Sequence, residues 1–238
     1  MSLPFFYKEN IDLAATTIVL DEDTSKHIVQ VLRMKIGEQL QLTNGKGNLF
    51  TCEIKDDNRK KCIVSVMQKS ETVNPKSTIT IAISLIKNNT RFEWFLEKAT
   101  EIGVNEIIPI ICERTEKTAF KFDRMSSILI SAMLQSQQTW LPVLHEPVKY
   151  ANMQMSKWEN TEKYIAHCED VQNKRPLANE PINQVTNKLI LIGPEGDFTT
   201  TEIRQALENN FTPVSLGNTR LRTETAGVAA AVLLTAFK

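Results

Sequence analysis

Residues 187–202, NKLILIGPEGDFTTTE, join an apolar run to a polar segment through a turn with two glycines, a proline and two carboxylates. The apolar run predicts a buried strand. Thr199 and Glu202 have the spacing of a capping box, so a helix is expected to begin directly after the turn. Ligands of open α/β sheets bind outside the carboxyl ends of the strands, which makes this turn a candidate site. The alternative is a capped turn that binds nothing.

A second stretch, SLGNTRLRTETAG at residues 215–227, repeats the pattern of a strand end running into a helix. Arg220 and Arg222 come just before the predicted helix, where the helix dipole favours anions and disfavours cations. Arginines in such a place often have a partner. Arg222 either meets a ligand or forms a surface ion pair with Glu224 or Glu195.

The chain around these stretches alternates strand and helix from residue 75 onward. This alternation predicts an α/β domain with a mostly parallel sheet. The polar segment 169–187 is expected to be a long surface loop. Strands are predicted at 77–86, 106–112, 163–168, 187–193 and 212–217, and helices at 90–103, 122–138, 199–210 and 223–237.

The N-terminal part of the chain, before residue 75, has a different sequence pattern. It contains short β segments and a hairpin turn, NGKG, at residues 44–47. An amphipathic helix is predicted from residue 21 to near Gly37. Together these elements predict a small barrel-like β domain that carries a helix. Its strands are expected at 16–20, 38–43, 48–54 and 61–67.

Composition limits the class of protein. The 238 residues are 42% hydrophobic, which suits one large or two modest globular domains. Lys plus Arg and Asp plus Glu are both 28, so net charge does not indicate a nucleic-acid partner. We expect a cytoplasmic protein, because neither a signal-peptide pattern nor a run of about 20 apolar residues is present.

The four cysteines, Cys52, Cys62, Cys112 and Cys168, show no C-x-x-C pairing. No histidine lies near them at the spacing of metal ligands. We therefore expect free thiols, with no metal site and no disulfide framework.

The two motifs together, LIGPEGDFT and SLGNTRLRTETA, resemble the C-terminal signature of the SPOUT methyltransferases. More narrowly, they resemble the ribosomal RNA small subunit methyltransferase E family, which methylates uracil N3 in 16S rRNA. HIVQVLRM (27–34), RFEWFLEKATEIGV (91–104) and ICERTE (111–116) are similar to other segments of that family. Two positions depart from its pattern: Asp197 replaces a usual Gly, and Gln137-Gln138 replaces a usual Gly-Arg.

The resemblance implies two domains. Residues 1–72 would form a PUA-like β-barrel that binds RNA, and residues 73–238 a SPOUT-type α/β domain with a C-terminal trefoil knot. It also implies a homodimer whose substrate is 16S rRNA, expected within the assembled small ribosomal subunit. No membrane partner is expected.

The resemblance further implies that S-adenosylmethionine binds, bent, between the two motifs. A methyl sulfonium is already activated, but uracil N3 must lose a proton, so a base and a cation near the methyl group would serve. Arg222 is the expected cation, and Glu224 or Glu195 is the base or orients Arg222. The cofactor contacts implied are Leu191, Ile192, Gly193, Pro194, Glu195, Gly196, Ser215, Leu216, Gly217, Leu221, Arg222 and Thr223.

Four basic residues are candidate phosphate contacts, with a solvated surface role as the alternative for each: Arg33, Lys87, Arg91 and Lys98. Two other functions are compatible with the sequence. One is 2′-O-ribose methylation by the same fold and cofactor. The other is a non-catalytic RNA-binding assembly protein.

Overall fold

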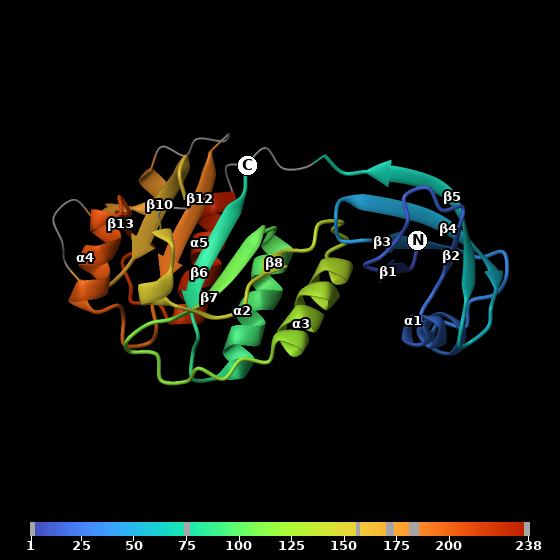
Figure 1. Cartoon of the computed structure of the whole chain (residues 1–238), viewed down its shortest axis with the longest axis horizontal. Helices are drawn as coiled ribbons and strands as arrows, with labels where there is room; N and C mark the ends of the chain where they lie inside the picture. The colour runs from blue at the N-terminus through green and yellow to red at the C-terminus, as the bar shows by residue number, and fades with distance from the viewer. Residues whose placement is uncertain (1–2, 74–76, 156–157, 170–173, 181–185, 236–238) are drawn as a thin grey trace. The chain divides into compact units, whose positions relative to one another are not determined.

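The computed structural model describes residues 3–73, 77–155, 158–169, 174–180 and 186–235. The chain packs into two compact units (Figure 1). One consists of Met1–Asn74 and Met133–Leu141, and the other of Pro75–Ala132 and Pro142–Lys238. None of the helices in the described ranges is long and apolar enough to cross a membrane.

The first unit is built on a five-stranded sheet in the order β1-β3-β4-β5-β2. β1 pairs in parallel with β3, and the other pairs are antiparallel. Two register irregularities between β4 and β5 bend the strands and curl the sheet. The strands are β1 (Phe5–Tyr7), β2 (Thr17–Val19), β3 (Gln39–Thr43), β4 (Asn48–Asp56) and β5 (Ile63–Glu71).

The hairpin and the four strands expected in this unit are present, whereas β1 was not predicted. The predicted barrel is not seen, because the edge strands β1 and β2 do not pair with each other in the described residues. The result is a curled, open sheet. Alternate residues of its strands point into the core of this unit, and Leu40, Leu42 and Ile54 among them are fully buried.

The helix of the first unit begins at α1 (Glu22–Lys26) and continues as a π-helical turn, η1 (His27–Val31). Asp21 caps it by accepting a hydrogen bond from the Thr24 backbone N–H at 2.9 Å. The helix ends before Arg33, which has a φ of +57°. The predicted end near Gly37 is therefore too late.

A distant segment completes the first unit. The backbone N–H of Leu141 donates to Gly45 O, and that of Gly47 donates to Thr139 O, both at 2.9 Å. Gly47 has a φ of +85°, and a Cβ there would lie 2.4 Å from the Trp140 ring. The glycines of the hairpin turn therefore allow residues 139–141 to pack directly against it.

The second unit contains a parallel sheet in the order β11-β13-β10-β12-β6-β7-β8, with β9 also paired to β7. Its strands are β6 (Ile79–Ser84), β7 (Glu106–Ile111), β8 (Val143–Leu144), β9 (Val148–Lys149), β10 (Thr161–Ala166), β11 (Arg175–Pro176), β12 (Asn187–Ile192) and β13 (Thr212–Ser215). Its helices are α2 (Asn89–Ile102), α3 (Phe122–Gln135), α4 (Thr200–Glu208) and α5 (Thr223–Thr235), with 3-10 turns η2 (Tyr150–Asn152) and η4 (Leu177–Asn179). The α/β fold class is confirmed.

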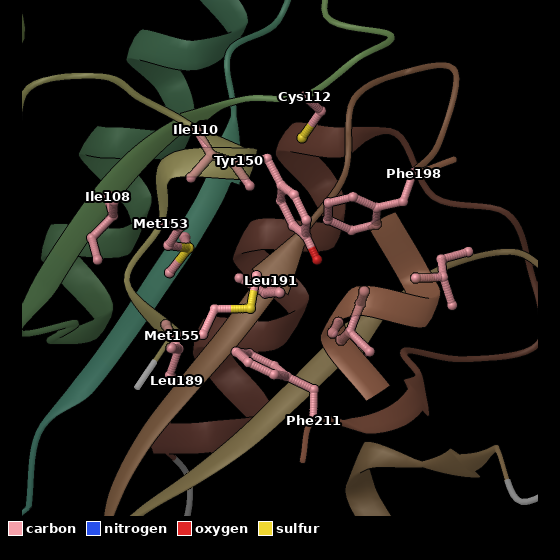
Figure 2. Close-up of a cluster of buried hydrophobic side chains, with 14 residues drawn as sticks. Ile108, Ile110, Cys112, Tyr150, Met153, Met155, Leu189, Leu191, Phe198 and Phe211 are labelled. Carbon is pink, nitrogen blue, oxygen red and sulfur yellow. The ribbon is translucent and has the colours of Figure 1, made fainter. Parts of the chain in front are cut away.

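Both faces of this sheet are covered. All six residues of β6 are buried, as expected for a central parallel strand. One face packs with α4 in a core that includes Leu189, Leu191 and Tyr150 (Figure 2). α5 packs against β6, β12 and α2. The predicted capping box at the start of α4 is confirmed, with Thr199 and Glu202 each accepting from the other's backbone.

The predicted surface loop at 169–187 is wrong for the part that is described. β11 pairs with β13 at the edge of the sheet, and Leu177 is fully buried. Residues 170–173 and 181–185 lie outside the described ranges. The two-residue strands β8, β9 and β11 were also missed, because so short a segment has no detectable periodicity.

Gly227 of α5 lies close to side chains of α2 and β6. A Cβ at this position would lie 2.6 Å from Phe95 Cε2 and 2.8 Å from Ile83 Cδ1. We expect Gly227→Ala to destabilise the protein by about 1–3 kcal/mol, because overpacking outweighs the gain in helix propensity. Urea denaturation measures this. The double variant Phe95→Leu/Gly227→Ala should recover part of the loss, and an unchanged midpoint in Gly227→Ala would contradict the packing argument.

Candidate active site

The candidate site lies at a switch point in the strand order of the second unit. β10 is flanked by β12 on one side and by β13 on the other, although both strands follow β10 in the sequence. The carboxyl ends of such neighbouring strands diverge and leave a crevice. A cavity of about 490 Å³ opens there.

Both sequence motifs reach this cavity. It is lined by residues 166–168, 192–195 and 214–223, together with Lys174, Asp197 and Ala226. Most of the expected cofactor contacts are among them. Leu191 and Gly196 are not, because Leu191 belongs to the core shared with α4 and Gly196 lies beside Arg114. Glu224, one of the two expected bases, is also outside the lining.

The turn after β12 is held by its own side chains. A Cβ on Gly193 would lie 3.0 Å from the Phe198 ring, so this glycine is required by packing. The Asp197 backbone N–H donates to Pro194 O at 2.9 Å. The Thr223 hydroxyl donates to Gly193 O at 3.0 Å, which ties the start of α5 to the turn. The two motifs therefore form one connected structure.

The two departures from the family pattern share a physical explanation. Asp197 has a φ of +64° and Gln137 a φ of +55°, a region that favours glycine. Asp tolerates it better than most residues. The Asp197 carboxylate also accepts hydrogen bonds from the backbone N–H groups of Cys168 (2.7 Å) and Phe198 (2.9 Å). These bonds stabilise the left-handed backbone conformation of Asp197 without a glycine.

The charged residues of the motifs are not paired with each other. Glu224 is buried and its Oε1 lies 3.6 Å from Arg91 Nε on α2. Glu195 is exposed, and its Oε1 accepts from the Lys87 backbone N–H at 3.1 Å.

Arg222 lines the cavity just before α5. Its side chain makes no ion pair or hydrogen bond to another residue in the described part of the chain. The expected alternative of a surface ion pair with Glu224 or Glu195 is therefore not observed. Arg222 is therefore an exposed residue of the cavity lining that has no carboxylate partner among the described residues.

Comparison with known proteins identifies the fold and its class. A family model described as "RNA methyltransferase domain" matches residues 73–235, well over half of the chain. The chain belongs to the RNA methyltransferase family. A second model, described as "RNA methyltransferase PUA domain", matches residues 20–67 and confirms a PUA-like N-terminal unit.

Individual members of the RNA methyltransferase family are similar over nearly the whole chain. Ribosomal RNA small subunit methyltransferase E of Rickettsia conorii is 28% identical over 215 residues, 90% of this chain and 87% of that protein. The structure of a probable rRNA-methyltransferase from Porphyromonas gingivalis is 38% identical, with a TM-score of 0.88 over 98% of this chain and 99% of that one. A ribosomal RNA small subunit methyltransferase E from Neisseria gonorrhoeae, bound to S-adenosyl methionine, is 27% identical, with a TM-score of 0.87 over 99% and 98%. The family that the motifs indicated is confirmed.

The sequence did not single out the wall of the cavity that His167, Cys168 and Lys174 form in this RNA methyltransferase. These three residues follow β10. A signal for them was present, since KYIAHC is also a predicted strand that ends in polar residues. Without the strand order, nothing indicated that β10 lies between the two motif-bearing strands.

The four candidate phosphate contacts are in different settings. Lys87 Nζ lies 2.8 Å from Glu116 Oε2, and Lys98 Nζ lies 2.7 Å from Glu97 Oε1 and 2.9 Å from Glu101 Oε1. Arg91 faces Glu224. Arg33, in the first unit, is exposed at the end of η1. Lys87 and Arg91 lie close to the site through their contacts with Glu195 and Glu224.

His167 should make the stability of this methyltransferase depend on pH. It is 6% exposed, and neither ring nitrogen has a hydrogen-bond partner in the described residues. Burial and then the charge of Lys174 lower its pKa, against weaker opposing effects of Asp197 and Glu169. The unfolded chain therefore takes up the proton at a higher pH than the folded chain does. Stability should be fully present above about pH 6.5 and fall as the pH decreases through and below that value.

Urea midpoints at about pH 7.5 and about pH 5.5 test this expectation. His167→Gln is the comparison, because it keeps a polar side chain that does not titrate. The loss of stability on acidification should be smaller in the variant than in the wild type. Equal losses would assign the pH dependence to other groups.

Proposed function

We propose that this protein transfers the methyl group of S-adenosylmethionine to N3 of a specific uridine in 16S rRNA. The observation that carries the proposal is the cavity itself, which an RNA methyltransferase domain builds from two glycine-containing strand ends. The related Neisseria gonorrhoeae enzyme of the same fold binds S-adenosyl methionine.

The residues present suit such a ligand. The cavity volume of about 490 Å³ is within the range of small-molecule sites, roughly 300–1,000 Å³. Gly217 lines it with a φ of +139° and nothing within 4 Å of where a Cβ would be, so its backbone is open to a ligand. The apolar residues Ile192, Leu216 and Leu221 line the cavity together with the acidic residues Glu195 and Asp197. When bound, S-adenosylmethionine supplies an activated methyl group.

The protein's part in the reaction is to place the uracil and remove its proton. When N3 accepts the methyl group, its proton would have to pass to a base, and the residues of the cavity would hold the uracil in line with that group. Arg222 would stabilise the negative charge that develops on the carbonyl oxygens beside N3. Its lack of a carboxylate partner supports this role.

Of the two carboxylates considered as the base, Glu195 is the better candidate. It lines the cavity and is exposed, whereas Glu224 lies outside the lining, is buried and faces Arg91. We propose Glu195 as the proton acceptor and Glu224 as a residue that holds Arg91 and α2 against the start of α5.

The wider architecture follows the family resemblance. We propose that residues 1–72 contribute RNA binding and residues 73–238 the methyltransferase domain, with the C-terminal segment threaded into a trefoil knot. The return of α5 to β6 and β12, after β13 on the far side of β10, supports such a path. We also propose a homodimer that acts in the bacterial cytoplasm on the assembled small subunit.

The function is tested by incubating the protein with isotopically labelled S-adenosylmethionine and unmethylated small ribosomal subunits. Nuclease digestion and mass spectrometry then map the label. We expect one labelled methyl group on the base of a uridine. A label on a ribose would instead indicate 2′-O-methylation. Tight subunit binding without cofactor binding, measured by calorimetry, would indicate a non-catalytic assembly protein.

A further inference from the structure

The carbonyl groups on the outer side of the turn at 193–198 are held by an arginine that does not line the cavity. Arg114 Nη1 donates to Gly196 O at 2.7 Å and is 3.4 Å from Phe198 O. Arg114 comes from the loop after β7. Its side chain contacts the turn after β12, and so it connects the ends of β7 and β12, which are separated in the sheet by β6.

The same arginine lies against the second glycine of the turn. A Cβ on Gly196 would lie 3.4 Å from both Cβ and Cδ of Arg114, which is close to ordinary van der Waals contact. The aliphatic part of Arg114 therefore lies beside Gly196, while its guanidinium binds the carbonyl oxygen of the same residue.

The loop that carries Arg114 is itself fixed. The Glu113 backbone N–H donates to Glu202 Oε1 at 2.9 Å, and Glu202 is the buried residue that caps α4. The Thr115 hydroxyl accepts from Cys112 N at 2.9 Å and lies 2.9 Å from the Ser84 hydroxyl. Consecutive residues of this loop thus contact both the turn and the helix that follows it.

The other donors to the turn, apart from Arg220, are neutral groups in the described residues. Asp197 N donates to Pro194 O, the Thr223 hydroxyl donates to Gly193 O, and the carboxylates of Asp197 and Glu195 accept from backbone N–H groups. Arg220 Nη2 is 3.5 Å from Glu195 O, at the limit of a hydrogen bond. Arg114 therefore provides the strongest charged donor to the turn.

We propose that Arg114 is a positioning residue of the methyl-transfer site, which sets the turn that carries Glu195 and lines the cavity. It acts through the turn and not by contact with the cofactor. The inference rests on the proposed function for its effect on cofactor binding, but its effect on the turn itself can be measured without any ligand.

Three variants test this role. Arg114→Ala removes the donor and the stem, and Arg114→Lys keeps a charge and most of the stem. Arg124→Ala is the matched control, because it removes an exposed arginine and its ion pair with Glu93, at 2.5 Å, elsewhere on the second unit. The first measurement is amide hydrogen exchange at Asp197 by NMR without ligand. The second is the dissociation constant of S-adenosylmethionine by calorimetry.

We expect Arg114→Ala to exchange the Asp197 amide faster and to bind the cofactor about tenfold or more weakly, since a hydrogen bond from a charged group is lost. Arg114→Lys should recover part of both effects, and Arg124→Ala should match the wild type. Unchanged exchange in Arg114→Ala would overturn the proposal. Faster exchange with unchanged cofactor affinity would also overturn it, because the turn would then be held for fold stability alone.

Two further outcomes distinguish the positioning role of Arg114 from an RNA contact and from failure of the proposed function. If Arg114→Ala leaves exchange and cofactor affinity unchanged but raises KM for ribosomal subunits, Arg114 contacts RNA and the positioning role is rejected. If the wild type does not bind S-adenosylmethionine, the proposed function fails and the affinity prediction with it. The exchange measurement then still decides whether Arg114 orders the turn.

Discussion

Arg222→Ala is expected to lower the rate of methyl transfer on the order of a hundredfold while leaving cofactor affinity nearly unchanged. The physical reason is that Arg222 would interact chiefly with charge that develops on the uracil during the reaction. An interaction made only in the transition state slows the chemical step without weakening ground-state binding. Single-turnover kinetics at saturating S-adenosylmethionine measures the rate, and calorimetry measures the affinity.

The control for Arg222→Ala is Arg204→Ala, which removes an exposed arginine from α4, away from the cavity lining. Its rate should equal that of the wild type, and circular dichroism should show both variants folded. A rate within about threefold of the wild type in Arg222→Ala would reject the catalytic role. Loss of cofactor binding would instead assign Arg222 to the S-adenosylmethionine pocket and leave the uracil-stabilising group to be found.

Gly217→Val is expected to abolish measurable binding of S-adenosylmethionine with the fold intact. Gly217 lines the cavity, and no atom of the described residues lies within 4 Å of where its Cβ would be. A branched side chain would therefore enter space open to the ligand and not clash with the protein. The φ of +139° adds backbone strain for any residue with a side chain, on the order of 1–3 kcal/mol. Calorimetry measures binding, and urea denaturation measures the strain.

Gly37→Val separates these two effects. Gly37 has a φ of +91° and likewise has no protein atom within 4 Å of where a Cβ would be, but it lies in the first unit. This variant should show a comparable loss of stability and normal cofactor binding. If Gly217→Val binds the cofactor normally, the ligand does not occupy this part of the cavity. Gly196→Val is a poorer test than its motif position implied, because Gly196 does not line the cavity and lies beside Arg114.

The sequence by itself determined the order of the main elements and the location of the site. The apolar runs before Gly193 and Gly217 and the capping box at Thr199 are local signals, because burial in a parallel strand and capping of a helix each depend on neighbouring residues. The two motifs sufficed to indicate the family. The departures at Asp197 and Gln137 were visible as well, but their left-handed backbone conformations were not.

Only the tertiary structure decided which side chains meet. The strand order places β10 between β12 and β13, which brings His167 and Cys168 into the cavity wall. It also pairs Glu224 with Arg91 and leaves Arg222 without a carboxylate partner in the described part of the chain. These contacts join residues far apart in the chain, and no local propensity encodes the order in which parallel strands assemble. The sheet also brings the loop after β7 to the turn after β12, so Arg114 could be recognised as a partner of Gly196 only after folding.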